Sequence, residues 1–275
     1  MQRDNRAVSP AISSVIMTAA LVVLVLVAAS YANSSLTSQI AGDEFSANKQ
    51  FMQSTGLQID NVAWTIGRTE TIDYTAKYGQ VTFVPNVIDY TFEIYNGVSW
   101  QTLYSSTTGM VLFKMPVRDY NLGNNYSSRI MPSNSGSFLQ SNASSPVSQV
   151  FAVQKTPMQD GSYARIVAVP TVRVLNSALV TGVSYYVFYL PCLVSGSSPY
   201  LSQSVTLTGS NLNNFRPSGT TTQVRINATA VNPTPMGFNN AFFNFDNTSK
   251  TTIIPPGASV AFYIGTVEVS IGMAS

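Results

Sequence analysis

The stretch that decides the fold is an uncharged run near the N-terminus, Val15-Ile16-Met17-Thr18-Ala19-Ala20-Leu21-Val22-Val23-Leu24-Val25-Leu26-Val27-Ala28-Ala29. No charged residue occurs between Arg6 and Asp43. Taken over residues 11–32, the segment would rise about 33 Å as an α-helix, which matches the hydrocarbon thickness of a bilayer. The sequence therefore predicts one membrane-spanning helix, and Ser9 followed by Pro10 predicts where it starts.

Basic residues flank this helix on one side only. Arg3 and Arg6 precede the span, whereas the first basic residue after it is Lys49. Cytoplasmic flanks of membrane helices carry the excess of Lys and Arg. The N-terminus is therefore expected in the cytoplasm, and everything after the span outside the cell.

Three fates are open to the segment at this point. It can remain as an uncleaved anchor of the 275-residue chain. It can be a secretory signal peptide, because Ser30-Tyr31-Ala32 before Asn33 supplies a small-x-small cleavage site. It can also be a prepilin, in which a short basic leader is removed and the apolar segment stays on the mature protein.

The residues that lead into the apolar run are Arg6-Ala7-Val8-Ser9-Pro10-Ala11-Ile12. This start resembles that of archaeal type IV pilins with a class III signal peptide, whose precursors carry Arg-Gly or Arg-Ala, then Val-Ser-Pro and an aliphatic run. The resemblance covers roughly residues 6–32 and implies cleavage between Ala7 and Val8. The fifth mature residue would be Ile12, where bacterial pilins usually carry Glu, so the archaeal form is favoured over the bacterial one.

The resemblance also implies partners. A prepilin peptidase of the aspartyl-protease type would remove the leader on the cytoplasmic side, and the mature helix would wait in the membrane. An assembly ATPase and a membrane platform protein would then build a homopolymer through the N-terminal helices. The apolar side chains expected in the filament core are Ile12, Val15, Ile16, Leu21, Leu24 and Leu26.

Helical spacing continues beyond the span. Leu36, Ile40, Ala47 and Phe51 follow one another at intervals of four, seven and four residues and predict an apolar stripe. The helix is expected to continue to about Gly56. Gly42 and Asp43 interrupt the stripe, and two interpretations are open for them: a local break or bend in the helix, or simple fraying. A helix that is apolar on all sides must be buried in lipid or against like helices, so the long rod favours a filament subunit.

From Leu57 onward the pattern is that of β-strands. Residues 223–230 alternate, with Val224, Ile226 and Ala228 on one face and Arg225 and Asn227 on the other. Further strands are predicted at 81–84, 88–95, 98–104, 110–115, 150–154, 164–175, 183–190, 204–208, 241–245 and 260–271, the longer ones broken at Pro170 or Gly265. The predicted fold is α+β, with a leader at 1–7, a transmembrane and assembly helix at 8–56, and one antiparallel β-sandwich head domain at 57–275.

Five Asn-x-Ser/Thr sequons follow the span, at Asn33, Asn125, Asn142, Asn227 and Asn247. Asn33 lies so close to the span that a filament would bury it. The glycosylation sites expected on the extracellular domain are therefore Asn125, Asn142, Asn227 and Asn247.

Composition excludes most catalytic chemistry. The chain has no histidine, one cysteine, 14 basic and 12 acidic residues, and a net charge of +2. It offers no histidine triad, no His- or thiolate-ligated metal site and no basic patch for nucleic acid. Cys192 is expected to be a buried packing residue. We therefore expect no catalytic residues, no cofactor, no metal and no nucleic-acid partner.

The sequence thus predicts a structural subunit of an extracellular archaeal type IV pilus-like filament that serves adhesion. Before assembly it would be a single-pass membrane protein, and afterwards it would lie on the cell surface. The alternative is a membrane-anchored or secreted monomeric β-domain that acts as an adhesin or a carbohydrate-binding module.

Overall fold

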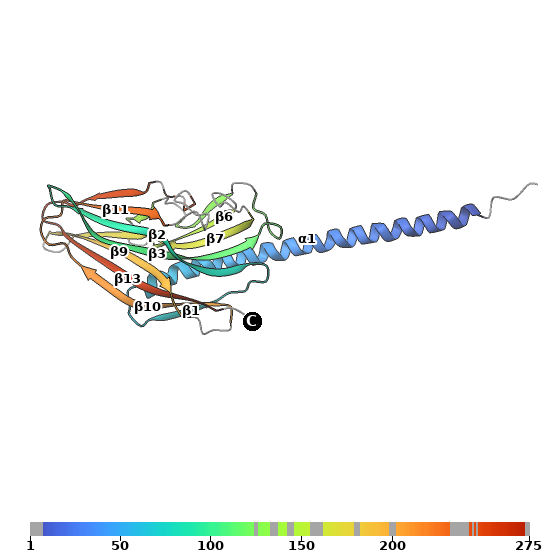
Figure 1. The fold of residues 1–275 in the computed structure, drawn as a ribbon, viewed down its shortest axis with the longest axis horizontal. Coiled ribbons are helices and arrows are strands. Elements are labelled where there is room, and N and C mark those ends of the chain that lie inside the picture. The colour runs from blue at the N-terminus through green and yellow to red at the C-terminus, as the bar shows by residue number, and fades with distance from the viewer. Residues whose placement is uncertain are drawn as a thin grey trace, which may run out of the picture. The chain divides into compact units, whose positions relative to one another are not determined.

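The computed structural model describes residues 8–123, 126–132, 137–141, 146–154, 162–178, 182–197, 202–231, 242–243, 245 and 247–272. One long helix, α1 (Val8–Val62, 55 residues), is followed by mostly antiparallel β-sheets (Figure 1). The chain divides into two compact units at Asp43 and Glu44. The predicted long N-terminal helix and the β-rich remainder of the chain are both confirmed.

The first sheet has six strands. Their order across the sheet is β1 (Thr69–Asp73), β10 (Ser204–Phe215), β13 (Ser259–Gly272), β9 (Ser184–Ser195), β8 (Val172–Ala178) and β5 (Leu139–Gln140). Two of its pairs, β13 with β9 and β5 with β8, are parallel, so the predicted antiparallel arrangement is correct for most strand pairs but not for these two. A parallel pair needs a long connection, and the chain between β9 and β13, which forms β10, β11 and β12, supplies it.

The second sheet has seven strands. Their order is β12 (Ser249–Ile253), β11 (Gln223–Ala230), β2 (Gln80–Tyr95), β3 (Trp100–Pro116), β7 (Tyr163–Pro170), β6 (Ser148–Gln154) and β4 (Ser127–Met131). Strands β2 and β3 each join two predicted runs. A register shift between Val84 and Ile88 carries β2 past Pro85 and past Asn86, whose φ is positive.

A cluster of buried hydrophobic residues includes members of both sheets. Phe92 of β2 packs edge-on against Phe262 of β13, with 5.6 Å between the ring centroids. Phe262 in turn stacks on Phe188 of β9 at 5.1 Å. All three rings are at most 1% exposed. Because aromatic rings carry the largest apolar surfaces, these contacts hold the two sheets together.

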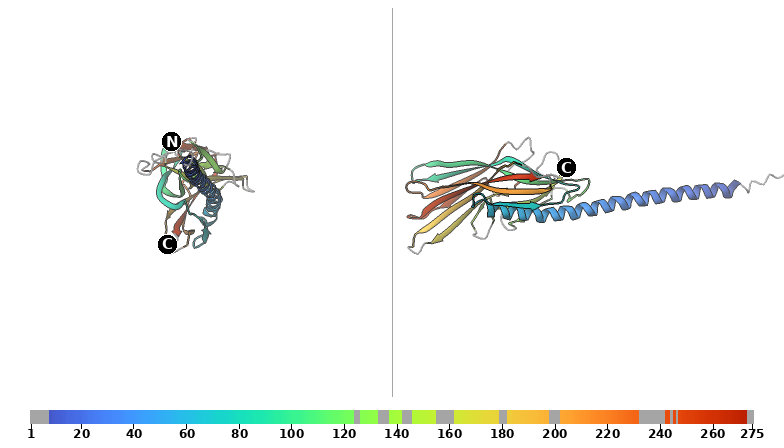
Figure 2. Two further views of the ribbon diagram at one scale, coloured as in Figure 1. Left: turned by 90° about the vertical axis from the view of Figure 1, so that its right-hand side faces the viewer. Right: turned by 90° about the horizontal axis from the view of Figure 1, so that it is seen from below.

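The C-terminal third of α1, from Glu44 onward, packs on the strands (Figure 2). The Phe45 ring lies 6.0 Å from that of Phe113 in β3, and the Phe51 ring lies 5.2 Å from that of Tyr74. The carboxylate of Glu44 accepts hydrogen bonds from the backbone amides of Tyr78 and Gly79. This third of the helix is thus part of the β-rich unit.

The predicted stripe and helix end are wrong in detail. Leu36, Ile40 and Ala47 are exposed, and of the predicted stripe only Phe51 is buried. From Glu44 onward, the buried residues of α1 are Phe45, Asn48, Phe51, Met52, Thr55, Gly56, Ile59 and Val62. The helix is continuous through Gly42 and continues past Gly56 to Val62. Gly56 does not end it because the missing side chain makes room for Met131 and Val150.

Two further strand predictions are wrong. Phe242 and Phe243 lie in a turn rather than in a strand at 241–245, and their side chains are buried in the core. Strand β13 is not interrupted at Gly265 but runs through it. A side chain at position 265 would overlap the carbonyl of Ala63, so glycine serves close approach rather than a strand break.

Candidate functional site

The main candidate site is the apolar segment of α1 that precedes Asp43. Its large apolar side chains between Ile12 and Val27 are each 51 to 69% exposed. The segment is long and apolar enough to cross a membrane. The predicted core residues, Ile12, Val15, Ile16, Leu21, Leu24 and Leu26, all belong to this exposed set. So much exposed apolar surface on one helix marks a segment that lipid or another protein covers.

Small residues shape one side of this segment. Ile16, Ala19, Ala20, Val23, Leu24 and Val27 form a shallow apolar face along one side of the helix. The two alanines leave room in which the side chains of a neighbouring helix can lie. The Thr18 hydroxyl donates to the Ser14 carbonyl at 2.8 Å, so this polar group is satisfied within the helix itself. The segment can therefore be buried in an apolar environment at little cost.

The expected leader cleavage site lies at the edge of the described residues. Val8 is the first residue of α1, two residues before Pro10. The helix thus begins slightly earlier than the Ser9 and Pro10 signal indicates. Ala7, on the other side of the expected bond, lies outside the described residues.

The sequons fall in different environments. Asn247 is exposed, and Asn33 is exposed on α1. Asn227 is half-buried, and its amide nitrogen donates to Glu93 Oε2 at 2.8 Å. Asn125 and Asn142 lie outside the described residues. Of the two expected sites that are described on the strand-rich unit, Asn247 is therefore the more accessible.

Cys192 is buried, as the sequence predicts, with 3% of its surface exposed. Its sulfur lies 3.3 Å from the Ser106 hydroxyl. Burial raises the pKa of the thiol to about 11, although the hydrogen bond with Ser106 opposes this. A buried thiol that stays protonated at neutral pH is a packing group and not a nucleophile.

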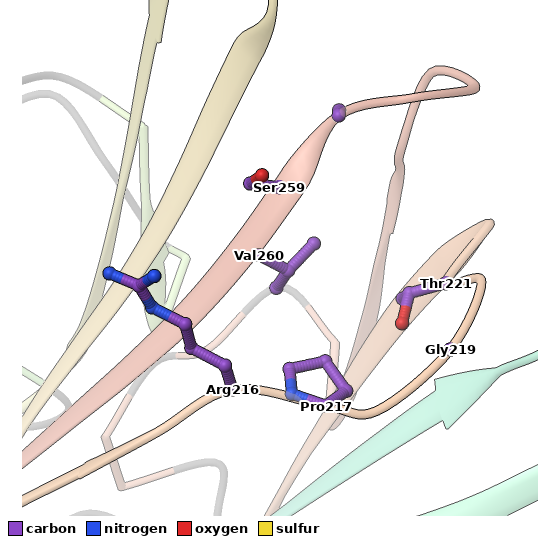
Figure 3. A pocket seen from close by; sticks show the side chains of 7 residues that line it. Arg216, Pro217, Gly219, Thr221, Ser259 and Val260 are labelled. Atoms are coloured by element: carbon purple, nitrogen blue, oxygen red, sulfur yellow. The ribbon is translucent and has the colours of Figure 1, made fainter.

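Two cavities lie among the described strands and their loops. The loop between β10 and β11 and the start of β13 enclose a polar pocket of about 180 Å³, near Arg216, Pro217, Gly219, Thr221, Ser259 and Val260 (Figure 3). That is smaller than the pockets of about 300–1,000 Å³ that usually hold small molecules. A second cleft, of about 490 Å³, lies beside Asn176, Tyr186 and Lys250. Among the described residues, no acidic side chain lines either space, and no three potential metal ligands gather at one point.

One side-chain cluster went unrecognised in the sequence. We call Glu93, Tyr95, Trp100, Arg225 and Asn227 the Trp100 patch. Arg225 Nε donates to Glu93 Oε2 at 2.6 Å, and the Arg225 guanidinium lies over the Trp100 ring, 4.1 Å from its centroid. Hydrogen bonding to Arg225 lowers the pKa of Glu93 and raises that of Arg225, so both stay ionised at neutral pH. The alternation of residues 223–230 predicts that Arg225 points away from the core. It does not predict the pairing of Arg225 with Glu93, which lies 132 residues away in the sequence.

Comparison with protein families, with curated proteins and with solved structures finds no match to this chain.

Proposed function

We propose that the protein is a structural subunit of an extracellular filament of the archaeal type IV pilus kind. In this proposal the apolar segment of α1 forms the filament core, and the β-rich unit covers it and mediates adhesion. The two sheets with their shared core are the β-sandwich head of the subunit. The head has no catalytic role and binds no cofactor.

The observation that carries the proposal is the uniform exposure of the apolar segment. Leu24 and Met17 are each 69% exposed, and Val22, the least exposed large apolar residue between Ile12 and Val27, is still 51% exposed. Exposure of such surface to water is unfavourable, because burial of each Å² of apolar surface contributes about 25 cal/mol of stabilising free energy. Lipid covers the segment before assembly, and copies of the same segment cover it in the filament.

The small residues on one face of the segment support packing between helices over a lone anchor. A single anchor in lipid needs only apolar side chains, and their shape is unimportant. Helix pairs in contrast gain stability from close contact, which small residues such as Ala19 and Ala20 allow. No charge lies between Arg6 and Asp43 to oppose burial in either environment.

Processing and assembly follow from the resemblance of residues 6–12. A prepilin peptidase cuts between Ala7 and Val8, so that Val8 becomes the first residue of both the mature chain and its helix. An assembly ATPase and a membrane platform protein then move the subunit from the membrane into the filament. The N-terminus faces the cytoplasm until that step.

The proposal is tested on filaments sheared from the cell surface. The sheared material is imaged by electron microscopy, and its proteins are identified by peptide mass. We expect filaments that contain this chain as a principal component. Recovery of the chain only as a membrane-bound monomer, or only as a free secreted domain, would instead support the monomeric adhesin or carbohydrate-binding module.

A further inference from the structure

We propose that the Trp100 patch is a binding site for a neutral glycan. The inference deepens the proposed function, since it names the class of ligand to which the exposed domain would adhere. It is argued from the side chains of β2, β3 and β11, three neighbouring strands of the second sheet (Figure 1).

The patch lies on the face of the second sheet that is turned away from the buried hydrophobic cluster. Phe92, Ile94, Val224 and Ile226 belong to that cluster. Successive residues of a strand point to opposite faces. Glu93, Tyr95, Arg225 and Asn227 therefore share the other face, where each is only partly buried.

The polar groups of the patch are held in place and only partly used. Arg225 Nε and Asn227 Nδ2 both donate to the same oxygen, Glu93 Oε2, at 2.6 and 2.8 Å. Within the described part of the chain, Glu93 Oε1, Asn227 Oδ1 and the two terminal nitrogens of Arg225 have no hydrogen-bond partner. The patch thus offers acceptors and donors side by side in fixed positions.

Charge balance selects the kind of ligand. Glu93 and Arg225 neutralise each other, and Asn227 is uncharged. Glu93 would repel an anion, and Arg225 would repel a cation. An anion would bind only the hydrogen-bond donors of the patch, and a metal cation only its acceptors. A hydroxyl group both donates and accepts, so a neutral polyhydroxylated molecule fits the patch best.

Apolar surface next to these groups matches the other half of a sugar, its C–H face. The rings of Tyr95 and Trp100 lie 5.3 Å apart and are both partly exposed. Ile253, in the same row of paired residues, is 76% exposed, and Val98, in the loop before Trp100, is 86% exposed. Ile253 pairs with Gln223, Gln223 with Tyr95, and Tyr95 with Trp100, so that the row spans about 14 Å across four strands.

The site is also preorganised. Asn96 Oδ1 accepts hydrogen bonds from the backbone amides of Val98 and Ser99, each at 2.9 Å, and so stiffens the loop that leads into Trp100. The stacked guanidinium of Arg225 fixes the indole from one side. Groups that are already fixed lose little entropy when a ligand binds.

The test uses the full chain in a zwitterionic detergent that carries no sugar. The probes are neutral gluco-, manno- and galacto-oligosaccharides, with sulfated and uronic acid oligosaccharides as the charged comparison. Binding is followed by the fluorescence of the two tryptophans, Trp64 and Trp100. We expect at least one neutral probe to change the fluorescence and the charged probes to leave it unchanged.

Variants place the binding on the patch. Trp100→Phe should abolish the fluorescence change, and Arg225→Ala should weaken binding at least about tenfold. Arg216→Ala is the matched control, because Arg216 also lies over an aromatic ring, that of Tyr185, but outside the patch. It should bind as the wild type does. The unfolding temperature of each variant shows whether it is folded. The response of the wild-type protein to the neutral probes tests the inference even if a variant does not fold.

Three results would overturn the inference: no response to any neutral probe, binding of charged probes alone, or unchanged affinity in a folded Arg225→Ala variant. Because binding is measured on the solubilised subunit, failure here leaves the filament proposal intact. Failure to find filaments likewise leaves the binding result intact.

Discussion

Gly265 of β13 lies directly beneath the backbone carbonyl of Ala63, the residue that follows α1. A side chain at position 265 would overlap that carbonyl. Gly209 of β10 approaches the carbonyls of Val62 and Thr65 in the same way. The end of the helix thus rests on the backbone of two neighbouring strands, and this close approach fixes the last turn of α1 in the β-rich unit.

Gly265→Ala should therefore destabilise the β-rich unit. The added methyl group forces the helix end away from the sheet, and overpacking of this kind costs about 1–3 kcal/mol. The free energy of unfolding in urea measures the effect. Glu268→Ala in the same strand is the control, since Glu268 is exposed and its loss should cost less than about 0.5 kcal/mol. Equal stability of the two variants would contradict the close contact.

The ion pair between Glu93 and Arg225 should make stability depend on pH. Hydrogen bonding to Arg225 lowers the pKa of Glu93 in the folded state. The stabilisation is therefore complete above the ordinary glutamate pKa of about 4.3 and is lost as the pH falls through the lowered folded value. Glu93→Gln should unfold about 1 kcal/mol more easily at pH 7, and the difference should shrink below about pH 4.

Urea unfolding of both proteins between pH 7 and pH 3 measures this difference. Glu70→Gln is the control, because the pair of Glu70 with Arg68 is more exposed and contributes less. A difference between wild type and Glu93→Gln that stays constant over the whole range would rule out the ion pair as its source.

The buried face of α1 shows where prediction from sequence reaches its limit. Asn48 and Thr55 lie on that face and are at most 1% exposed, although both are polar. Asn48 donates to the carbonyls of Glu44 and Thr75, and Thr55 donates to that of Phe51. Because these partners satisfy the polar groups, burial costs little. A stripe that is traced through apolar residues alone misses this face and selects Leu36, Ile40 and Ala47 instead.

The strands show the same limit. Strands with many apolar residues, such as β2, β9 and β13, are readily predicted from the sequence. Strands β1 and β12, Thr-Glu-Thr-Ile-Asp and Ser-Lys-Thr-Thr-Ile, lie at sheet edges and carry few apolar residues, so they give no such signal. The Trp100 patch could not be predicted either, because strand pairing brings Glu93 and Arg225 together. The apolar segment of α1 needs no tertiary contact to be recognised.

Processing at Ala7 should be visible in the mass of the mature protein. Loss of the first seven of the 275 residues leaves 268, which begin at Val8. Cleavage after Ala32 would leave 243, which begin at Asn33, and an uncleaved anchor would keep all 275. We expect an N-terminal peptide that starts at Val8. A mature N-terminus at Asn33 would remove the apolar segment and with it the filament core.

Glycan occupancy should differ between Asn247 and Asn227. Asn247 is exposed, whereas the amide nitrogen of Asn227 is hydrogen-bonded to Glu93 in the middle of a sheet. Glycopeptide mass spectrometry of the native protein should find a glycan on Asn247 and none on Asn227. Thr229→Ala, which removes the second sequon but keeps Asn227, should leave the total glycan mass unchanged. A glycan on Asn227 would contradict this and would also block the Trp100 patch.

The count of surface filaments on cells that express Leu24→Asp tests most directly whether the apolar segment forms the filament core. Aspartate at mid-span costs about 3 kcal/mol on insertion scales and leaves an unpaired charge among packed helices. Leu24→Ile keeps the surface apolar and serves as the control, and immunoblots of membranes show that both subunits are present. We expect normal filaments with Leu24→Ile and none with Leu24→Asp. Filaments of normal number and length built from Leu24→Asp subunits would show that the segment lies outside the core.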